Sequence, residues 1–274
     1  MDVPPDDAAA PVVDFDTSVA HPARVYDYWL GGKDNFAADR EAAELAIQAN
    51  PLVVPGVRIN RAFLGRAVRY LAAEAGIRQF LDIGTGLPSA NNTHQVAQSV
   101  AADSRVVYVD NDPIVLAHAR ALLTSTAVGR TAYLDADLRD PETILRRAAG
   151  TLDFSEPVAV MMLAILQLLP DADDPHAIVA RVMASMPPGS YLVISHPASD
   201  IQPEAMAEMA RRLNARQRAE SQVCFRALAD VTAFFGGLDL IPPGVVKPHE
   251  WRPDPGEKMP DHDVTAWCGV ARKP

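Results

Sequence analysis

The stretch that decides the fold is Phe80-Leu81-Asp82-Ile83-Gly84-Thr85-Gly86, an apolar run that ends in a glycine turn. A second apolar run, Val106 to Val109, ends in Asp110-Asn111. A strand, a glycine turn, a helix and a second strand ending in a carboxylate are typical of a Rossmann-like sheet. In such a sheet, glycine lets the backbone approach a nucleoside, and the carboxylate accepts hydrogen bonds from its ribose. The sequence therefore predicts an adenosine-containing ligand.

The turn departs from the dinucleotide pattern at its third glycine. Leu87-Pro88-Ser89 stands where the backbone would have to approach a pyrophosphate. This departure favours a nucleoside without a pyrophosphate, of which S-adenosylmethionine is the common one. It disfavours a nicotinamide cofactor.

Composition narrows the class of protein. The 274 residues are 49% hydrophobic, which is enough for one sizeable α/β core. The formal net charge of −10 disfavours sequence-independent binding of nucleic acid, because such binding depends on a surplus of Lys and Arg. Cys224 and Cys268 are isolated and lack metal-ligand spacing, so we expect no metal site and a reducing compartment.

We expect neither a targeting signal nor a membrane-spanning segment. Met1 to Pro11 is acidic and rich in Pro and Ala, unlike a signal peptide, and we expect residues 1–13 to form a disordered tail. The longest apolar run, Val158 to Leu166, is far short of the roughly 20 residues of a membrane-spanning helix. We therefore expect a cytoplasmic protein without a membrane partner, and its oligomeric state stays open.

Strand and helix signals alternate from about residue 60 to 240, the pattern of a parallel sheet with helices on both faces. One apolar stripe at helical spacing, which we expect in the core, consists of Phe63, Leu64, Ala67, Val68 and Leu71. Three later strand-like runs are each followed by an Asp-Pro pair: Asp112-Pro113, Asp140-Pro141 and Asp174-Pro175. Each pair predicts a helix start, since Asp caps the first turn and Pro needs no N–H there.

The last strands differ from the first four. Tyr191 to Ser195 does not alternate and reads as a buried fifth strand. Leu238 to Ile241 and Val264 to Ala271 are separated by a Pro-rich loop too short for a helical crossover, so we expect them to pair antiparallel at the sheet edge. The predicted fold class is α/β: a seven-stranded, mostly parallel sheet with an antiparallel last strand pair and helices on both faces.

The segment Ala23 to Arg40 resembles the signature of the S-adenosyl methyltransferase family long listed as a domain of unknown function. Asn60 to Leu64, Leu81 to Pro88 and Gly269 to Lys273 are similar to it too, so the resemblance extends from about Asp14 to Lys273. It implies a class I, Rossmann-like methyltransferase fold with S-adenosylmethionine as cofactor. It supplies no substrate.

The cofactor site is expected at the strand ends. Asp110 is the expected ribose ligand, and Gly84 and Gly86 are expected to contact the cofactor, unless they are ordinary turn glycines. The resemblance places at Asp82 a carboxylate that orders the loop or meets the methionine amino group, with a helix-cap or surface role as the alternative. Asn111 either touches the adenine edge or caps the next helix.

Two further strand ends complete the expected cofactor site. After the third strand, Asp137 with the Leu138 backbone is the expected partner of the adenine amino group, unless the carboxylate belongs only to a solvated loop. After the fourth strand, Ala164 and Ile165 stand where methyltransferases place backbone next to the sulfonium. The residues there are apolar apart from Gln167, so no general base is visible.

Residues 14–56 are predicted to form an N-terminal helical lid on a methyltransferase domain of residues 57–274. Gly31-Gly32 suggests a hinge, because each glycine costs roughly 1 kcal/mol inside a helix. The side chains assigned to lid or substrate are Tyr26, Tyr28, Lys33, Asn35 and Arg61. Arg58 and Arg61 flank the same opening in the sequence and are candidates to bind the methionine carboxylate or an acidic substrate. Two alternatives stay open: the N-terminal helix only covers the sheet, and the two arginines are surface residues.

His196, directly after the fifth strand, is the candidate general base. It lies at the edge where ligands bind in open α/β sheets, and histidine titrates near neutrality. A structural role is the alternative. His94, His118 and His176 are expected on helices as surface or capping groups, and Trp251 in a loop that borders the substrate opening.

The sequence thus predicts an S-adenosylmethionine-dependent methyltransferase acting on an unidentified small molecule. Methyl transfer from a sulfonium mainly needs alignment and exclusion of water, so a dedicated base is optional. One alternative is a sensor that binds S-adenosylmethionine or its demethylated product without transfer. A less favoured alternative is an NAD-dependent oxidoreductase.

Overall fold

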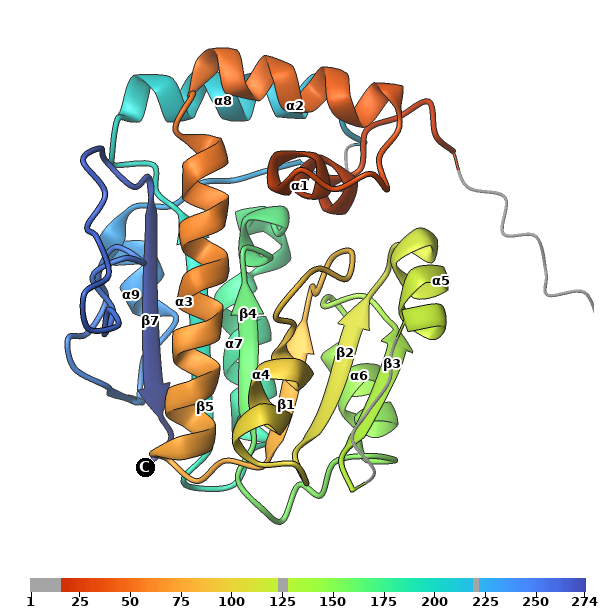
Figure 1. Cartoon of the computed structure of the whole chain (residues 1–274), viewed down its shortest axis with the longest axis vertical. Helices are drawn as coiled ribbons and strands as arrows, with labels where there is room; N and C mark the ends of the chain where they lie inside the picture. The colour runs from red at the N-terminus through yellow and green to blue at the C-terminus, as the bar shows by residue number, and fades with distance from the viewer. Residues whose placement is uncertain (1–15, 123–127, 219–221) are drawn as a thin grey trace, which may run out of the picture.

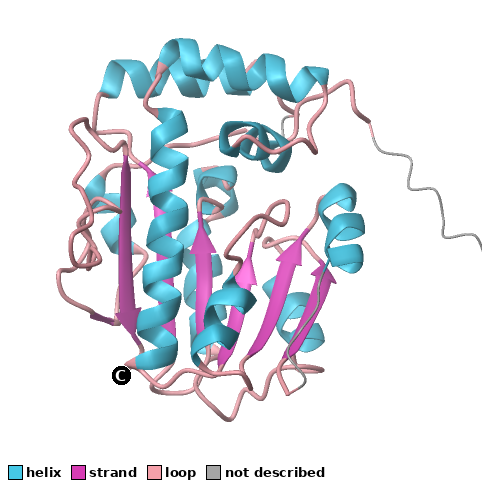
Figure 2. Cartoon of the chain, viewed as in Figure 1, coloured by secondary structure: helices cyan, strands magenta, loops and turns pink. Residues whose placement is uncertain are grey.

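A seven-stranded sheet forms the middle of the molecule (Figures 1 and 2). The computed structural model describes residues 16–122, 128–218 and 222–274, without the side chains of residues 118–122, so the expected tail of residues 1–13 lies outside it. The strands are β1 (Gln79–Ile83), β2 (Arg105–Asp110), β3 (Arg130–Asp135), β4 (Ala159–Leu163), β5 (Tyr191–Pro197), β6 (Asp239–Leu240) and β7 (Ala266–Arg272). They are ordered β3-β2-β1-β4-β5-β7-β6.

The strand directions agree with the predicted topology. β1 to β5 are parallel, and β7 runs antiparallel between β5 and β6. The predicted antiparallel pair at the sheet edge is confirmed, with β6 as a short outer strand. Because the five parallel strands share one direction, their carboxyl ends meet at one edge of the sheet, which faces upward in Figure 1.

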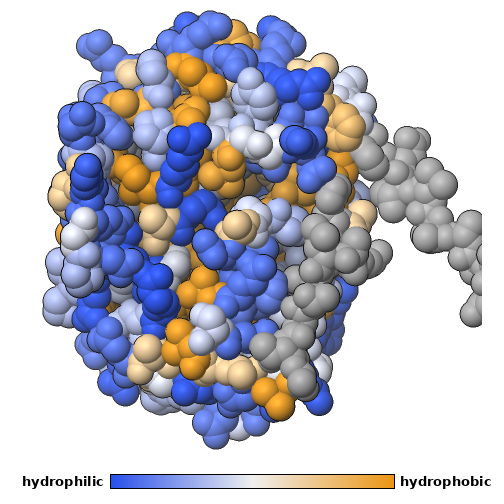
Figure 3. Space-filling view, in the orientation of Figure 1, coloured by the Kyte–Doolittle hydropathy of each residue, from blue (hydrophilic) through white to orange (hydrophobic). Residues whose placement is uncertain are grey.

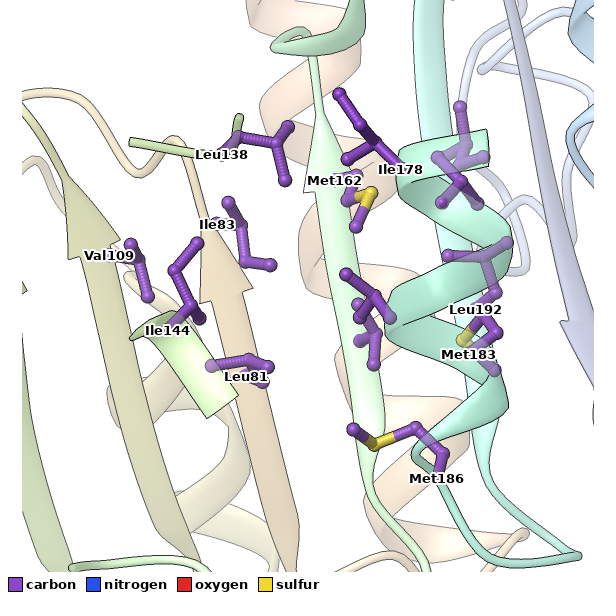
Figure 4. Packing of buried hydrophobic residues seen from close by; sticks show 14 of the residues in the cluster. Leu81, Ile83, Val109, Leu138, Ile144, Met162, Ile178, Met183, Met186 and Leu192 are labelled. Carbon is purple, nitrogen blue, oxygen red and sulfur yellow. The ribbon is translucent and has the colours of Figure 1, made fainter. Parts of the chain in front are cut away.

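Helices cover both faces of the sheet. α3 (Val53–Ala73) and α4 (Thr93–Val100) pack on one face, where the predicted stripe of α3, including Phe63 and Leu71, is buried as expected. α6 (Pro141–Ala148), α7 (Pro175–Ala184) and α9 (Leu228–Ala233) pack on the other. Figure 4 shows this second core, with Ile144 of α6 and Met183 of α7 against the strands.

The predicted helix starts are confirmed. α5 (Pro113–Leu122), α6 and α7 each begin at the proline of an Asp-Pro pair. Asp112 accepts the N–H of Ile114 at 2.9 Å, and Asp140 and Asp174 each accept the N–H three residues further on at 3.1 Å. The strands therefore end in turns whose geometry is fixed by local capping, a requirement for a precise site at the sheet edge.

A separate helical layer lies across the carboxyl ends of the strands (Figure 1). It consists of α1 (Pro22–Leu30), α2 (Ala37–Ala49) and α8 (Pro203–Asn214), and we call it the cap. Trp29 of α1, Ala43 of α2 and Met209 of α8 share one apolar cluster with the first turns of α3. The N-terminal helices thus depend on a helix more than 150 residues further along the chain, which sequence reasoning had not joined to them.

The Gly31-Gly32 pair ends a helix and does not interrupt one. Gly31 is the C-cap of α1 in the left-handed conformation (φ 82°). A Cβ at Gly32 would lie 1.9 Å from Asp27 Oδ1, so glycine is required there by close approach. Asp27 Oδ2 also accepts the N–H of Asp34 at 3.0 Å and the amide of Asn35 at 2.8 Å. The hinge interpretation is wrong in its premise, because the pair serves as a helix end held by Asp27.

Two further expectations need correction. Trp251 is fully buried, packs edge-on against Phe63 and Tyr70 of α3, and is not among the residues that line the cavity at the sheet edge, so it does not border the opening as expected. His94 lies in the first turn of α4 and is buried, with its backbone N–H donating to the Tyr108 hydroxyl at 2.8 Å, so it is no surface group. The side chain of His118 lies outside the described residues.

Candidate active site

A cavity of about 250 Å³ lies between the sheet edge and the cap. It is lined by twelve of the fifteen sequence-predicted site residues: Tyr26, Arg61, Asp82, Gly84, Gly86, Asp110, Asn111, Asp137, Leu138, Ala164, Ile165 and His196. Tyr28, Lys33 and Asn35 are not among its lining residues. Tyr28 donates to Glu44 at 2.6 Å, Lys33 is exposed, and Asn35 binds Asp27 within the turn after α1.

Asp110 lies at the end of β2, buried beside the glycine turn. Its Oδ2 accepts the N–H of Gly86 at 2.8 Å, and its Oδ1 accepts the N–H of Asp112 at 3.0 Å. Burial raises the pKa of Asp110, and these two N–H groups oppose that shift by favouring the ionised form. A carboxylate has about four lone-pair sites, so capacity remains for two ribose hydroxyls.

Asp82, at the end of β1, is a second buried carboxyl group on the same edge. Its Oδ2 accepts the Thr93 hydroxyl at 2.6 Å. Burial raises the pKa of Asp82 to about 6, against the lowering effects of Thr93 and of the nearby Arg61 cation. A carboxyl group so poised is stabilised in its charged form by an ammonium group brought next to it.

Arg61 of α3 reaches the loop that follows β1. Its guanidinium donates to the carbonyls of Ala90 and Asn91 at 3.1 and 3.2 Å and to Asn92 Oδ1 at 3.3 Å. The same cation lowers the pKa of Asp82. Arg61 thus lies near Asp82 at the sheet edge of the cavity and is no isolated surface arginine.

The glycine turn and the end of β4 fit against each other. A Cβ at Gly84 would lie 2.4 Å from Ile165 Cγ1, whereas a Cβ at Gly86 would meet nothing within 4 Å. Gly84 therefore makes room for Ile165, and Gly86 is needed for its positive φ of 63°. Ala164 also has a positive φ, 51°, and its N–H donates to Ser195 O at 2.9 Å. A non-glycine residue held in this region is a strained position of the kind found at functional sites.

The ends of β2 and β3 meet at the rim of the cavity. Asn111 Nδ2 donates to Asp137 Oδ2 at 3.3 Å, and Asp137 Oδ1 accepts the N–H of Arg139 at 2.8 Å. Asp112, not Asn111, caps α5. The Leu138 side chain is buried in the core, so this residue can offer only its backbone to a ligand.

His196 has both ring nitrogens engaged. Its Nδ1 lies 2.9 Å from the carbonyl of Pro197, so Nδ1 carries the proton, and its Nε2 lies 3.2 Å from Arg226 Nη1, so Nε2 is the acceptor. Burial lowers the pKa of His196 to about 4. The lone pair that a general base needs is already paired with a guanidinium, so this arrangement gives the general-base hypothesis no support.

Several residues of α8, α3 and β5 that line the cavity were not predicted as site residues from the sequence. Met206, Met209 and Leu213 of α8 line it, as do Asn60 of α3 and Ser195 of β5. Tyr26 of α1 donates its hydroxyl to Val57 O at 3.3 Å and accepts from Asn60 Nδ2 at 3.0 Å. The inward Met spacing of α8 was visible in the sequence, but nothing there placed this helix over the sheet edge.

Comparison with known proteins decides the family. A family model described as S-adenosyl methyltransferase matches residues 8–274. The chain belongs to this family. Its cofactor is accordingly S-adenosylmethionine, and the buried carboxylates and capped turns at the sheet edge fit a nucleoside with a cationic amino acid tail.

Solved structures agree with this assignment. A DUF574 family protein from Streptomyces avermitilis MA-4680 is 46% identical, with 94% of this chain and 99% of that chain covered and a TM-score of 0.90. A putative methyltransferase from Thermobifida fusca YX is 40% identical, with 96% and 97% covered and a TM-score of 0.86. The plantazolicin methyltransferase BpumL, 10% identical over 92% of this chain and 95% of its own with a TM-score of 0.54, shares the fold. No curated protein matches the chain.

Within the described ranges, no helix is long and apolar enough to cross a membrane. In the same residues, no group of three or more His, Cys, Asp or Glu side chains is placed to hold a metal ion.

Proposed function

We propose that this protein transfers a methyl group from S-adenosylmethionine to a small-molecule acceptor inside the cavity, in the cytoplasm. One observation carries the proposal: Asp82 and Asp110 at the sheet edge and Asn60 and Met209 beneath the cap line the same cavity. A cofactor and an acceptor could therefore lie end to end in it. A site for binding alone would not need the second half.

Each group at the sheet edge has a part in the proposed cofactor site. Asp110 would hold the ribose, Asp137 and the Leu138 backbone the adenine, and Asp82 with Arg61 the charged ends of the methionine. Ala164 and Ile165 would lie by the sulfur. Bound here, S-adenosylmethionine supplies an electrophilic methyl carbon whose bond to sulfur breaks as the acceptor atom bonds to it, the electron pair going to sulfur and the acceptor's proton to solvent.

The residues of this chain contribute alignment and exclusion of water, which such a displacement chiefly needs. We propose that the cap is the layer that closes over both reactants. It is tied to the cofactor end, because His21 Nδ1 lies 2.9 Å from Asp112 Oδ2 and the Asp112 N–H donates to Asp110. Cofactor binding at Asp110 would therefore change the contacts of His21 at the start of α1.

The test is incubation of the protein with methyl-labelled S-adenosylmethionine and fractions of a small-molecule cell extract. We expect labelled product in at least one fraction, and none with Asp110→Ala protein. Calorimetry should show binding of S-adenosylhomocysteine and none of NAD. Binding without label in any fraction would indicate a sensor, and binding of NAD alone would overturn the cofactor site.

Hydrogen exchange tests the cap. With S-adenosylhomocysteine bound, amides of α1 should exchange more slowly, because closure orders the backbone. Unchanged exchange in α1, with slower exchange at β1 and β2, would make the cap a static cover.

A further inference from the structure

The half of the cavity beneath the cap, which we call the acceptor chamber, is mainly apolar. Its walls come from distant parts of the chain: Trp29, Val53, Val57, Met206, Met209 and Phe225. Hydrophobic side chains show on the upper half of the face in Figure 3, around the cap layer. An apolar enclosure of this kind selects molecules with an apolar body.

Within these walls are polar atoms that have no partner. Ser195 Oγ, Gln167 Oε1 and Asn60 Oδ1 are buried without a hydrogen bond, and all three residues line the cavity. Ser195 is 1% exposed. Gln217 Oε1, on the cap side of the cavity, is a fourth such atom.

The orientation of two of these amides is fixed by their neighbours. Gln167 Nε2 lies 2.7 Å from the carbonyl of Ala164, which can only accept, so the nitrogen must be there and Oε1 must point elsewhere. The Tyr26 hydroxyl donates to Val57 O and so accepts from Asn60 Nδ2, which leaves Asn60 Oδ1 free to accept. Gln167 Oε1 and Asn60 Oδ1 are therefore acceptors, and a partner for them must be a donor. The Ser195 hydroxyl can either accept or donate, so it can pair with the same donor group.

Gln167 and Ser195 lie close to the proposed reacting end. Gln167 is bonded to Ala164 O, and Ser195 O accepts the Ala164 N–H. Ala164 is the residue whose backbone we place by the sulfur. If an O–H or N–H group of the acceptor molecule donates to Gln167 and Ser195, the oxygen or nitrogen of that group is therefore the atom that would receive the methyl group.

The charged side chains that line the cavity lie at the strand ends and not in the acceptor chamber. Apart from the tyrosines Tyr26, Tyr108 and Tyr133, the ionisable side chains among the described lining residues are His21, Arg61, Asp82, Asp110, Asp137, Arg139 and His196. Arg61 is turned to the loop after β1, His21 pairs with Asp112, and His196 is kept neutral by burial. Asp82, Asp110, Asp137 and Arg139 belong to the strand ends of the cofactor half. An anionic acceptor would meet no counter-charge in the acceptor chamber.

We infer that the methyl acceptor is a neutral molecule with an apolar body and an O–H or N–H group at the end that is methylated. This inference rests on the proposed function. The donor group would be held by Gln167 Oε1 and Ser195 Oγ, and the apolar body would lie among Met206, Met209 and Trp29. The methylated product, if its O–H has been replaced, lacks the donor and binds less tightly, which favours its release.

The test uses three matched probes and protein saturated with S-adenosylhomocysteine, so that no transfer occurs. The probes are 2-naphthol, which is neutral and a donor, 2-methoxynaphthalene, which lacks the donor, and 2-naphthoate, which is anionic at about pH 7.5. By calorimetry we expect 2-naphthol to bind at least about tenfold more tightly than either analogue, because a buried acceptor site rejects a ligand that cannot pair with it.

Two variants locate the effect. Ser195→Ala should reduce the preference for 2-naphthol over 2-methoxynaphthalene at least about threefold, while S-adenosylhomocysteine affinity and the melting temperature stay near those of the unmodified protein. Gln167→Met should reduce the preference by a similar factor, and its melting temperature should also fall, because the bond from Nε2 to the Ala164 carbonyl is lost. Gln48→Leu, an exposed glutamine of α2 outside the cavity, is the matched control and should leave the preference unchanged.

The outcomes separate this inference from the proposed function. If S-adenosylhomocysteine does not bind, the proposed function fails. If it binds but 2-naphthoate binds as tightly as 2-naphthol, or the two neutral probes bind equally, or none of the three binds, the inferred acceptor class is overturned and the cofactor site stands.

Discussion

The two halves of the cavity hold their polar groups in opposite ways. In the cofactor half, Asp110 accepts two backbone N–H groups and Asp82 accepts the Thr93 hydroxyl. In the acceptor chamber, Ser195 Oγ and Gln167 Oε1 have no partner. The first half is preorganised around charge by its own turns, and the second leaves acceptors open among apolar walls. The difference teaches that the strand ends of the sheet supply the proposed cofactor site, whereas the packing of distant helices supplies the proposed selectivity for the acceptor.

The largest expected effect tests whether the cap is held by its own buried charges. Asp39, fully buried in α2, accepts Arg24 Nε at 2.9 Å as well as the N–H groups of His21 and Phe36. Asp39→Ala leaves the buried Arg24 without this partner and should lower the free energy of unfolding by about 3–5 kcal/mol in urea titrations. Glu41→Ala breaks the exposed pair with Arg216 and should cost about 0–1 kcal/mol. Equal losses would mean that the Arg24–Asp39 pair does not hold the cap.

The second prediction concerns Asp82, whose raised pKa should make the stability of the sheet-edge half of the cavity depend on pH. The folded-state pKa of Asp82 is raised from 3.8 to about 6, so its contribution to stability is present below about pH 4 and is lost as the pH rises through 6. Asp82→Asn should therefore be more stable than the unmodified protein at pH 8, by up to about 3 kcal/mol, and the gap should close toward pH 4. Melting curves across this range measure it.

The same variant should bind S-adenosylhomocysteine less tightly at pH 8, because asparagine supplies no charge for the amino group. Stability gained and affinity lost would mark Asp82 as a functional carboxylate. A variant that loses both would show a purely structural one.

Asp110→Ala should weaken S-adenosylhomocysteine binding by about 10- to 150-fold, or about 1.5–3 kcal/mol, because charge-assisted hydrogen bonds to the ribose are lost. Calorimetry with Asp103→Ala as control, an exposed carboxylate paired loosely with Arg78, measures the difference. Unchanged affinity would mean that the ribose does not bind at the end of β2, and the proposed cofactor site would be wrong.

The smallest effect concerns the two glycines of the turn. Both have positive φ, 76° at Gly84 and 63° at Gly86, so alanine strains both, but only Gly84 faces Ile165. Gly84→Ala should therefore lose about 1–3 kcal/mol more stability than Gly86→Ala, and Ile165→Ala should restore part of that difference in the double variant. Equal losses in the two single variants would show that β4 does not press on the turn.

The sequence by itself determined most of the fold and which residues lie at the sheet edge of the cavity. Asp-Pro caps, a glycine turn and apolar runs act over a few residues, so Gly86, Asp110 and the start of α5 could be placed by local geometry alone. The antiparallel pairing of the last two strands followed from the short Pro-rich connection between them, whereas the order of the strands was not predicted.

Only the tertiary structure decided the rest. It placed α8 beside α2 to close the cap, buried Trp251 against α3, and engaged both nitrogens of His196 with Pro197 and Arg226. It also left Ser195 and Gln167 unpaired beneath the cap. These features depend on which side chains meet across long separations in the chain. No local sequence pattern predicts these contacts, because the free energy that selects them comes from tertiary packing.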